Sequence, residues 1–187
     1  MKRLFIGIPI ESPKSVRHVE VWKRNSNLNR NVLNWTPPGN WHITLFFLGN
    51  TEESAVAVLQ QLIEESFSKI QAYQTELRGV GVFPNTNNPK VLWLGLDDLQ
   101  PLMPAYSQLG ESLQQNGFSF DQKPLKPHLT IARVKRADNP LAFQSLLSEF
   151  QETVFDRIEV NKAALFESIS TSAGPIYKPL FEKQLIR

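Results

Sequence analysis

The sequence predicts an α+β fold of two lobes related by a pseudo-twofold axis, each a mainly antiparallel sheet backed by helices. Apolar segments with a period of two alternate along the chain with amphipathic segments of helical period. The order helix, His-x-Thr strand, helix, strand, strand occurs twice. No linker rich in Gly, Ser or Pro separates the two halves, so residues 1–187 are expected to form a single bilobal domain with a central cleft.

The first half begins with an alternating strand and ends with a pair of strands around the turn PNTNNP. Ser12 and Pro13 supply an N-cap and a first-turn proline for the first helix. Asn50 and Glu53 resemble a capping box and indicate the start of the second helix. The expected strands are at about 3–10, 41–48, 73–82 and 90–96, and the expected helices are at about 13–25 and 52–67.

The second half repeats this order. A helix at about 100–115 is closed by Asn116 and Gly117, and Asp138-Asn139-Pro140 opens another that continues to about Gln151. Residues 118–120 are a further candidate for extended structure. The expected strands are at 128–134, 154–168 and 176–186, the last two separated by Ser-Thr-Ser-Ala-Gly-Pro.

The composition is that of an ordinary globular protein, with 41% hydrophobic and 20% charged residues. The absence of cysteine excludes disulfides, thiolate zinc sites and thiol nucleophiles, and it fits a reducing compartment, so we expect a cytoplasmic protein. We also expect a monomer. The N-terminal MKRLFIGIPIESPKS has basic residues before a short apolar run, but the run alternates like a strand and is not interpreted as a signal peptide. No stretch approaches the roughly 20 apolar residues that cross a membrane.

Basic residues gather in one part of a chain whose net charge is only +2. Between Lys123 and Arg136 there is no acidic residue. The basic residues of this segment are Lys123, Lys126, Arg133, Lys135 and Arg136. Such a cluster is either a solvated loop or the surroundings of an anionic ligand.

Two of the three histidines lie in the same frame, in NWHITLFFLG (residues 40–49) and KPHLTIARV (residues 126–134). Successive side chains in a strand point to opposite faces, so His42 shares a face with Thr44, and His128 with Thr130. The other face is expected to be buried and to carry Ile43, Leu45, Phe47 and Leu129. A twofold axis between the lobes would bring both polar faces into one cleft.

Two facing imidazoles can act as a proton acceptor and a proton donor in a displacement at phosphorus, without a metal. The threonine hydroxyls can donate hydrogen bonds to phosphate oxygens. Either histidine alone would more simply be a packed core residue, and His18, in the charged part of the first helix, is expected to be exposed. No third histidine or carboxylate stands at ligand spacing near either motif, so no metal and no other cofactor is expected.

The paired motifs resemble those of the two-histidine phosphoesterase superfamily, named for its H-x-T-x repeats. Within it, the chain is similar to the bacterial and archaeal RNA 2',3'-cyclic phosphodiesterases, also called 2'-5' RNA ligase-like or LigT-like proteins. The segments that carry the resemblance are RLFIGI, NWHITLFFLG, KVLWLGL, PLKPHLTIAR and IYKPL.

The resemblance implies a metal-independent opening of a 2',3'-cyclic phosphate, on an RNA terminus or a nucleoside, to a 2'-phosphate. His128 would accept the proton of water, His42 would give a proton to the departing 3'-oxygen, and Thr44 and Thr130 would hold the phosphate oxygens. The reverse reaction, with a ribose hydroxyl as nucleophile, would join RNA ends through a 2'-5' bond.

Three further residues are candidates for substrate binding. Arg133 matches the pattern H-x-T-x-x-R, but strict alternation places it on the face opposite His128 unless the strand bulges or ends first. Tyr177, in IYKPL, would contact the ligand or pack at an edge. Phe5, like Trp41 and Phe83, would stack on a base or lie in the core.

Two other functions remain open from the sequence. One is an RNA-end or nucleotide binding module without physiological turnover. The other keeps the two-histidine chemistry but acts on 2'-5' oligonucleotides or on cyclic phosphates of nucleotide-sugar metabolites.

Overall fold

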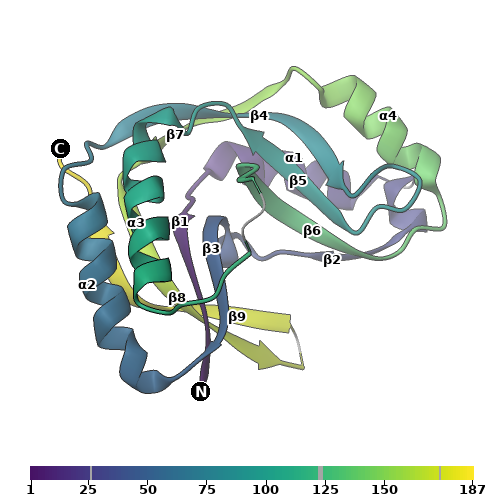
Figure 1. Ribbon diagram of the computed structural model, residues 1–187. Helices are drawn as coiled ribbons and strands as arrows, with labels where there is room; N and C mark the ends of the chain where they lie inside the picture. The colour runs from purple at the N-terminus through teal and green to yellow at the C-terminus, as the bar shows by residue number, and fades with distance from the viewer. Residues whose placement is uncertain (26, 122–123, 173) are drawn as a thin grey trace.

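The computed structural model describes residues 1–25, 27–121, 124–172 and 174–187 (Figure 1). Its strands are β1 (Lys2–Pro9), β2 (Val32–Trp35), β3 (His42–Thr51), β4 (Tyr73–Phe83), β5 (Val91–Leu96), β6 (His128–Arg136), β7 (Val154–Val160), β8 (Lys162–Thr171) and β9 (Gly174–Gln184). Its α-helices are α1 (Pro13–Lys23), α2 (Val56–Phe67), α3 (Met103–Gln115) and α4 (Pro140–Phe150). Short 3-10 turns lie at Leu28–Arg30, Pro38–Asn40, Glu53–Ala55 and Gln100–Leu102.

The strands of the described residues form one sheet that is almost divided in two. Its order is β7-β4-β5-β6-β3-β1-β8-β9, with β2 paired to β6 outside this path. The β3–β6 pairing consists of a single antiparallel partnership, Ile43 with Leu129. We call β3, β1, β8 and β9 the first lobe, and β7, β4, β5, β6 and β2 the second lobe. The predicted fold class of two antiparallel, helix-backed lobes is confirmed.

The two lobes do not correspond to the two halves of the sequence, as the repeat had suggested. β4 and β5 come from the first half but lie in the second lobe, beside β6. The helices cross as well: α1 packs on β7, whereas α3 packs beside α2, which covers β8 and β9. Figure 1 shows α2 and α3 side by side at one end of the molecule and α4 at the other. Each lobe therefore contains elements from both halves of the chain.

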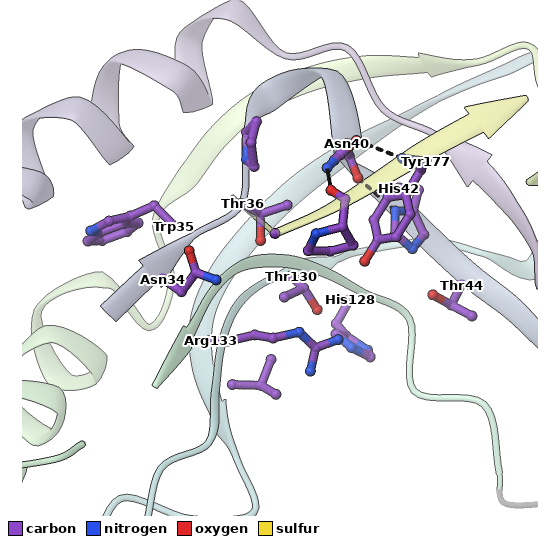
Figure 2. Close-up of a pocket in the computed structure, with 14 residues that line it drawn as sticks. Asn34, Trp35, Thr36, Asn40, His42, Thr44, His128, Thr130, Arg133 and Tyr177 are labelled. Carbon is purple, nitrogen blue, oxygen red and sulfur yellow. Dashed lines mark hydrogen bonds between the residues drawn. The ribbon is translucent and has the colours of Figure 1, made fainter. Parts of the chain in front are cut away.

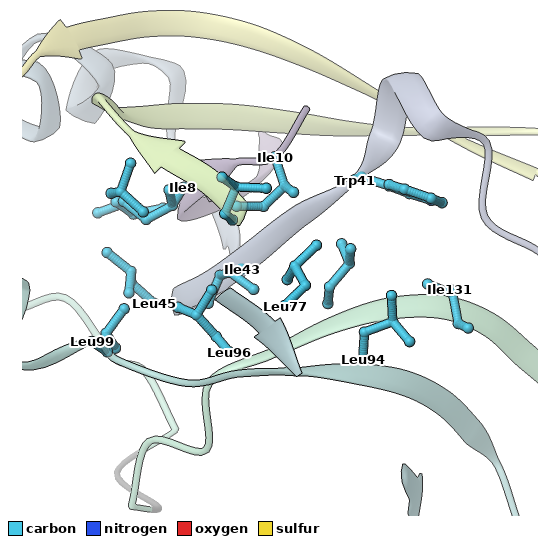
Figure 3. Close-up of a cluster of buried hydrophobic side chains, with 14 of the residues drawn as sticks. Ile8, Ile10, Trp41, Ile43, Leu45, Leu77, Leu94, Leu96, Leu99 and Ile131 are labelled. Atoms are coloured by element: carbon cyan, nitrogen blue, oxygen red, sulfur yellow. The ribbon is translucent and has the colours of Figure 1, made fainter. Parts of the chain in front are cut away.

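The hydrophobic core runs through the junction between the lobes (Figure 3). Ile43 and Leu129 are 1% and 0% exposed, and they belong to the same buried cluster as Ile8 and Leu94. Burial of one such side chain contributes roughly 1.5–3 kcal/mol. Gly7 permits the close approach of β1 to β3, since a Cβ there would lie 2.6 Å from the carbonyl oxygen of Ile43. The backbone of β3 and β6 is thus fixed by close packing at the junction between the lobes.

Local signals predicted several element ends correctly. The Ser12 side chain accepts a hydrogen bond from the backbone of Ser15 at the start of α1, with Pro13 in the first turn. Ser12 also donates to the buried carboxylate of Asp156 on β7, at 2.8 Å, which ties the start of α1 to the second lobe. After α3, Gly117 adopts a φ of 77°, the left-handed conformation that glycine tolerates.

Other expectations were wrong. Asn50 lies within β3, and the start of α2 carries no side-chain cap, so there is no capping box. β2 was missed, and residues 118–120 form no strand. The single strand expected at 154–168 is two strands that separate at Asn161, because β7 pairs with β4 while β8 pairs with β1. No helix among the described residues is long and apolar enough to cross a membrane.

Candidate active site

A cleft of about 320 Å³ lies at the junction of the two lobes (Figure 2). His42 and Thr44 line it from β3, and His128 and Thr130 line it from β6. The antiparallel pairing of Ile43 with Leu129 explains this convergence, because it places His42 across from Thr130 and Thr44 across from His128. The residue between the histidine and the threonine of each motif thus packs in the core while its neighbours face the cleft.

Each histidine is held by the same backbone contact. Nδ1 of His42 lies 2.7 Å from the carbonyl oxygen of Asn40, and Nδ1 of His128 lies 2.7 Å from that of Lys126. A carbonyl oxygen can only accept, so Nδ1 donates in both rings. Nε2 then carries the lone pair of each neutral ring and is the atom that can take up or release a proton.

The pKa of both imidazoles is lowered. Burial is the main cause for His42, whose pKa falls to about 4, with further contributions from the positive charges of His128 and Arg133. Burial also lowers the pKa of His128, and the charge of Arg133 adds to this effect. Both imidazoles are therefore neutral at pH 7, and an anion beside them would favour their charged forms.

Arg133 reaches the cleft because β6 bulges. Leu92 pairs with Ala132, and Trp93 pairs with Thr130, so Ile131 is an extra residue on β6. Ile131 and Ala132 are both buried, and the alternation resumes with Arg133 on the same side as His128. Figure 2 shows the Arg133 side chain extending past Thr130 toward His128.

β3 bulges at the equivalent position, which corrects one expectation from the sequence. Ile6 pairs with Phe46, and Gly7 pairs with Thr44, so Leu45 is the extra residue. Leu45 and Phe46 are buried, whereas Phe47 is 42% exposed instead of lying in the core. Phe47 is therefore the counterpart of Arg133, since each residue stands five positions after its histidine.

Tyr177 lines the cleft next to His42. Its ring lies edge-on to the imidazole with 5.0 Å between centroids. Phe5, by contrast, is only 3% exposed and packs behind His42, with its centroid 4.6 Å from the imidazole. We therefore assign Phe5 to packing, in place of the base contact expected from the sequence. Trp41 is likewise a core residue, 3% exposed, whose indole donates to the carbonyl of Thr36.

Asn40 is a site residue that sequence reasoning missed. Its Nδ2 donates to the carbonyl of Pro175 at 2.7 Å, and its Oδ1 accepts from the backbone N–H of Tyr177 at 3.2 Å (Figure 2). Asn40 therefore holds the start of β9 against the cleft, while its own carbonyl orients His42. Its position two residues before the first histidine was the one available signal, but the partner segment lies 135 residues away.

Of the lysines and arginines of the basic segment that the structure describes, one lines the cleft. Arg133 lines the cleft, Lys135 is exposed on β6, and Arg136 forms a salt bridge with Asp138 at 2.7 Å. Lys126 lies in a neighbouring pocket, and Lys123 lies outside the described residues. The described residues that line the cleft include three that can carry positive charge (His42, His128 and Arg133) and none that is acidic. The cleft therefore suits an anion.

Two other site expectations concern histidine and metal. His18 is half-buried on α1 and packs edge-on against Phe155, away from the cleft, so it is less exposed than expected. In the portion of the chain that the structure describes, no group of three or more His, Cys, Asp or Glu residues could hold a metal ion.

Comparison with known families gives an independent description of the chain. Residues 10–168 match the model of the 2'-5' RNA ligase superfamily. The chain is 30% identical over 188 residues to an RNA 2',3'-cyclic phosphodiesterase of Thermotoga maritima, covering 97% of this chain and 95% of that protein. A protein of the same name from Archaeoglobus fulgidus is 32% identical over 178 residues, covering 95% of this chain and 97% of that protein.

Solved structures show the same fold. TT0787 of Thermus thermophilus superimposes with a TM-score of 0.80 at 24% identity, covering 98% of this chain and 97% of that one. Escherichia coli LigT, crystallised with 3'-AMP, superimposes with a TM-score of 0.76 at 20% identity, covering 100% of this chain and 99% of that one.

Proposed function

This chain belongs to the 2'-5' RNA ligase superfamily, the two-histidine phosphoesterases, and from that membership and the geometry of its cleft we propose that it hydrolyses 2',3'-cyclic phosphates. The substrate class is the terminal cyclic phosphate of RNA or of a nucleoside, and the product is a 2'-phosphate. The names of the relatives from Thermotoga and Archaeoglobus support this choice of substrate.

The reaction needs a base and an acid on opposite sides of the phosphorus atom. We assign His128 as the base: its Nε2 takes the proton of water while the oxygen of that water forms a bond to phosphorus. The bond from phosphorus to the 3'-oxygen breaks, and His42 donates the proton from its Nε2 to that oxygen. Attack and departure from opposite sides agree with the placement of the rings on two different lobes.

The other cleft residues are assigned to the phosphate. Thr44 and Thr130 lie in the same cleft and can donate from their hydroxyl groups to the non-bridging oxygens. Arg133 can donate to the same oxygens and neutralise their charge. Tyr177 lies beside His42, held there by Asn40, and we assign it to the sugar or base of the nucleotide.

A bound phosphate also sets the protonation state of the acid. Burial lowers the pKa of His42 to about 4, so the ring by itself is neutral at pH 7. An anion between the two rings favours their charged forms. Substrate binding therefore raises the pKa of His42 and allows it to enter the reaction as an imidazolium.

One observation carries the proposal: two imidazoles from two lobes share one cleft, each with Nδ1 bonded to a carbonyl two residues upstream and Nε2 left for proton transfer. A nucleotide-binding module would need no such matched pair. The single-domain organisation of residues 1–187, a cytoplasmic location and a monomeric state remain predictions from the sequence.

The test is incubation of the protein with adenosine 2',3'-cyclic phosphate in excess EDTA, with the product identified by phosphorus NMR. Adenosine 2'-phosphate is expected. Tight binding of the cyclic nucleotide without product would favour the binding module, and loss of turnover in EDTA would contradict the metal-free mechanism. Parallel kinetics on 2'-5' oligonucleotides and on nucleotide-sugar cyclic phosphates would show whether another substrate is preferred.

A further inference from the structure

A second pocket opens beside the cleft and shares two of its residues. It has a volume of about 860 Å³, within the range of sites for small ligands. Thr44 and His128 line both cavities, whereas His42 lines the cleft and does not line this pocket. The pocket therefore lies on the His128 side of the phosphate position.

The walls of this pocket are aromatic and apolar. Phe47 and Phe83 line it, together with Tyr106 and Leu125. Phe83 packs edge-on against the imidazole of His128 with 4.9 Å between centroids, and Tyr106 stacks on Phe46 at 4.6 Å. Phe47 is 42% exposed, and the guanidinium of Arg3 lies over its ring, 5.0 Å from the centroid. Exposed rings of this kind are platforms on which nucleobases stack.

The water molecule that attacks in hydrolysis does not need aromatic or apolar side chains around it. In the mechanism proposed above, the attacking oxygen lies next to His128 and opposite the oxygen that His42 protonates. Any group attached to the attacking oxygen would therefore extend from His128 away from His42, into this pocket. We propose that the pocket is an acceptor subsite, which binds the nucleoside of an attacking 5'-hydroxyl. This inference rests on the proposed function.

The reaction at this subsite is a transfer that balances without a further reactant. The 5'-oxygen of the acceptor forms a bond to phosphorus, and its proton passes to Nε2 of His128. The bond from phosphorus to the 3'-oxygen of the donor breaks, and His42 supplies the proton for that oxygen. The product is a 2'-5' phosphodiester, and the reverse reaction cleaves the same bond.

The charges at the pocket are compatible with a nucleic acid strand. Lys126 is an exposed residue that lines the pocket, where it can pair with the phosphate that follows the acceptor nucleoside. Asp121 also lines the pocket, so the wall is of mixed charge rather than uniformly basic. We therefore assign the recognition of the acceptor mainly to stacking of its base.

The experiment measures how the donor partitions between transfer and hydrolysis. Adenosine 2',3'-cyclic phosphate is incubated with rising concentrations of adenosine or of glycerol, an alcohol without a base, and both products are quantified. The ratio of 2'-5' dinucleoside product to 2'-nucleotide should saturate with adenosine. With glycerol, the ratio of the glyceryl phosphodiester to 2'-nucleotide should stay low and rise linearly with concentration. Phe47→Ala should lower the adenosine ratio about tenfold, the size of one base–aromatic stack.

Two variants control this measurement. Phe47→Tyr keeps a ring and should retain the wild-type ratio. Leu141→Ala removes a 66% exposed apolar side chain of α4, outside both cavities, and should have no effect. Hydrolysis of the mononucleotide by Phe47→Ala should stay within about twofold of wild type, because water does not need the stack.

Three results would overturn the inference. The ratio could rise linearly with adenosine, or Phe47→Ala could leave it unchanged. The third is a raised KM in Phe47→Ala for a dinucleotide donor but not for the mononucleotide, which would assign the pocket to the preceding base of the donor strand. Each of these leaves hydrolysis intact, whereas absence of hydrolysis in the wild type would remove the proposed function and the acceptor subsite together.

Discussion

The two motif strands, β3 and β6, repeat one another in backbone and differ in side chains. Both begin with His-x-Thr, both hold Nδ1 of the histidine on a carbonyl two residues upstream, and both bulge at the residue after the threonine. After the bulge, β6 presents Arg133 to the cleft, while β3 presents Phe47 to the adjoining pocket. A repeated backbone thus presents the two histidines of the proposed acid–base pair. At the equivalent position five residues later, one strand presents a cation and the other an apolar ring.

The two histidines also differ in the aromatic side chains around them. His42 lies among Phe5, Phe166 and Tyr177. His128 packs against Phe83 and Trp93. Burial is the main cause of the lowered pKa in both rings, and the larger shift belongs to His42. Similar strands therefore hold two chemically different imidazoles, and His42, the proposed acid, is the ring that depends more on a bound anion for its proton.

The largest expected effect comes from removing either of the two imidazole rings. His42→Ala and His128→Ala should each lower kcat/KM on a cyclic nucleotide by about 10³-fold, because general acid–base catalysis contributes on that scale. The double variant should be little worse than either single one, since the two rings act as a unit. His18→Ala, at the histidine outside the cleft, is the matched control and should keep its activity. A single cleft variant with wild-type kcat/KM would refute the role assigned to that ring.

The next effect tests the position at which the strands differ. Arg133→Gln should lower kcat/KM by about 10²-fold through loss of a charged donor to the phosphate. Lys135→Gln removes an exposed cation from the same strand, outside the cleft, and should have little effect. Equal losses in the two variants would show that general attraction, rather than a contact in the cleft, explains the role of Arg133.

The pH profile tests the difference between the two imidazoles. The reactive free protein carries one proton on the pair, and both pKa values lie below 6.5. Above pH 6.5 that form therefore declines, and kcat/KM should fall about tenfold per pH unit. Arg133→Gln removes a positive charge that lowers both pKa values, so the falling limb should move to higher pH. A plateau in kcat/KM from pH 6.5 to 8 would contradict this assignment.

The smallest effect concerns Asn40, whose side-chain amide holds the start of β9. Lys126, the equivalent residue before β6, contacts its histidine through the backbone carbonyl. Asn40→Ala keeps the backbone carbonyl that orients His42 but releases the start of β9. We expect KM to rise about threefold to tenfold with kcat nearly unchanged, because Tyr177 loses its support while the acid–base pair does not. Asn87→Ala, at an exposed turn residue, serves as the control. A fall in kcat with constant KM would show that Asn40 acts on the proton transfer instead.

Much of the fold could be predicted because the deciding interactions are local. The alternation of β1, the Ser12-Pro13 start of α1 and the Gly117 end of α3 each depend on residues close together in the chain. The errors occurred where a distant partner decides. The strand at 154–168 divides because its two parts pair with different strands, and β2 exists because β6 offers it an edge.

The sequence by itself determined which four residues share the proposed site: the two His-x-Thr segments supply two imidazoles and two hydroxyls, since a period of two places each His and Thr on one face of its strand. Tertiary structure alone decided which other residues join them. Arg133 enters the cleft, and Phe47 leaves the core, because each strand bulges against its neighbour. Asn40 meets β9 across 135 residues of chain. Bulges and long-range contacts arise from the fit of one strand against another, and no pattern within a single strand contains that information.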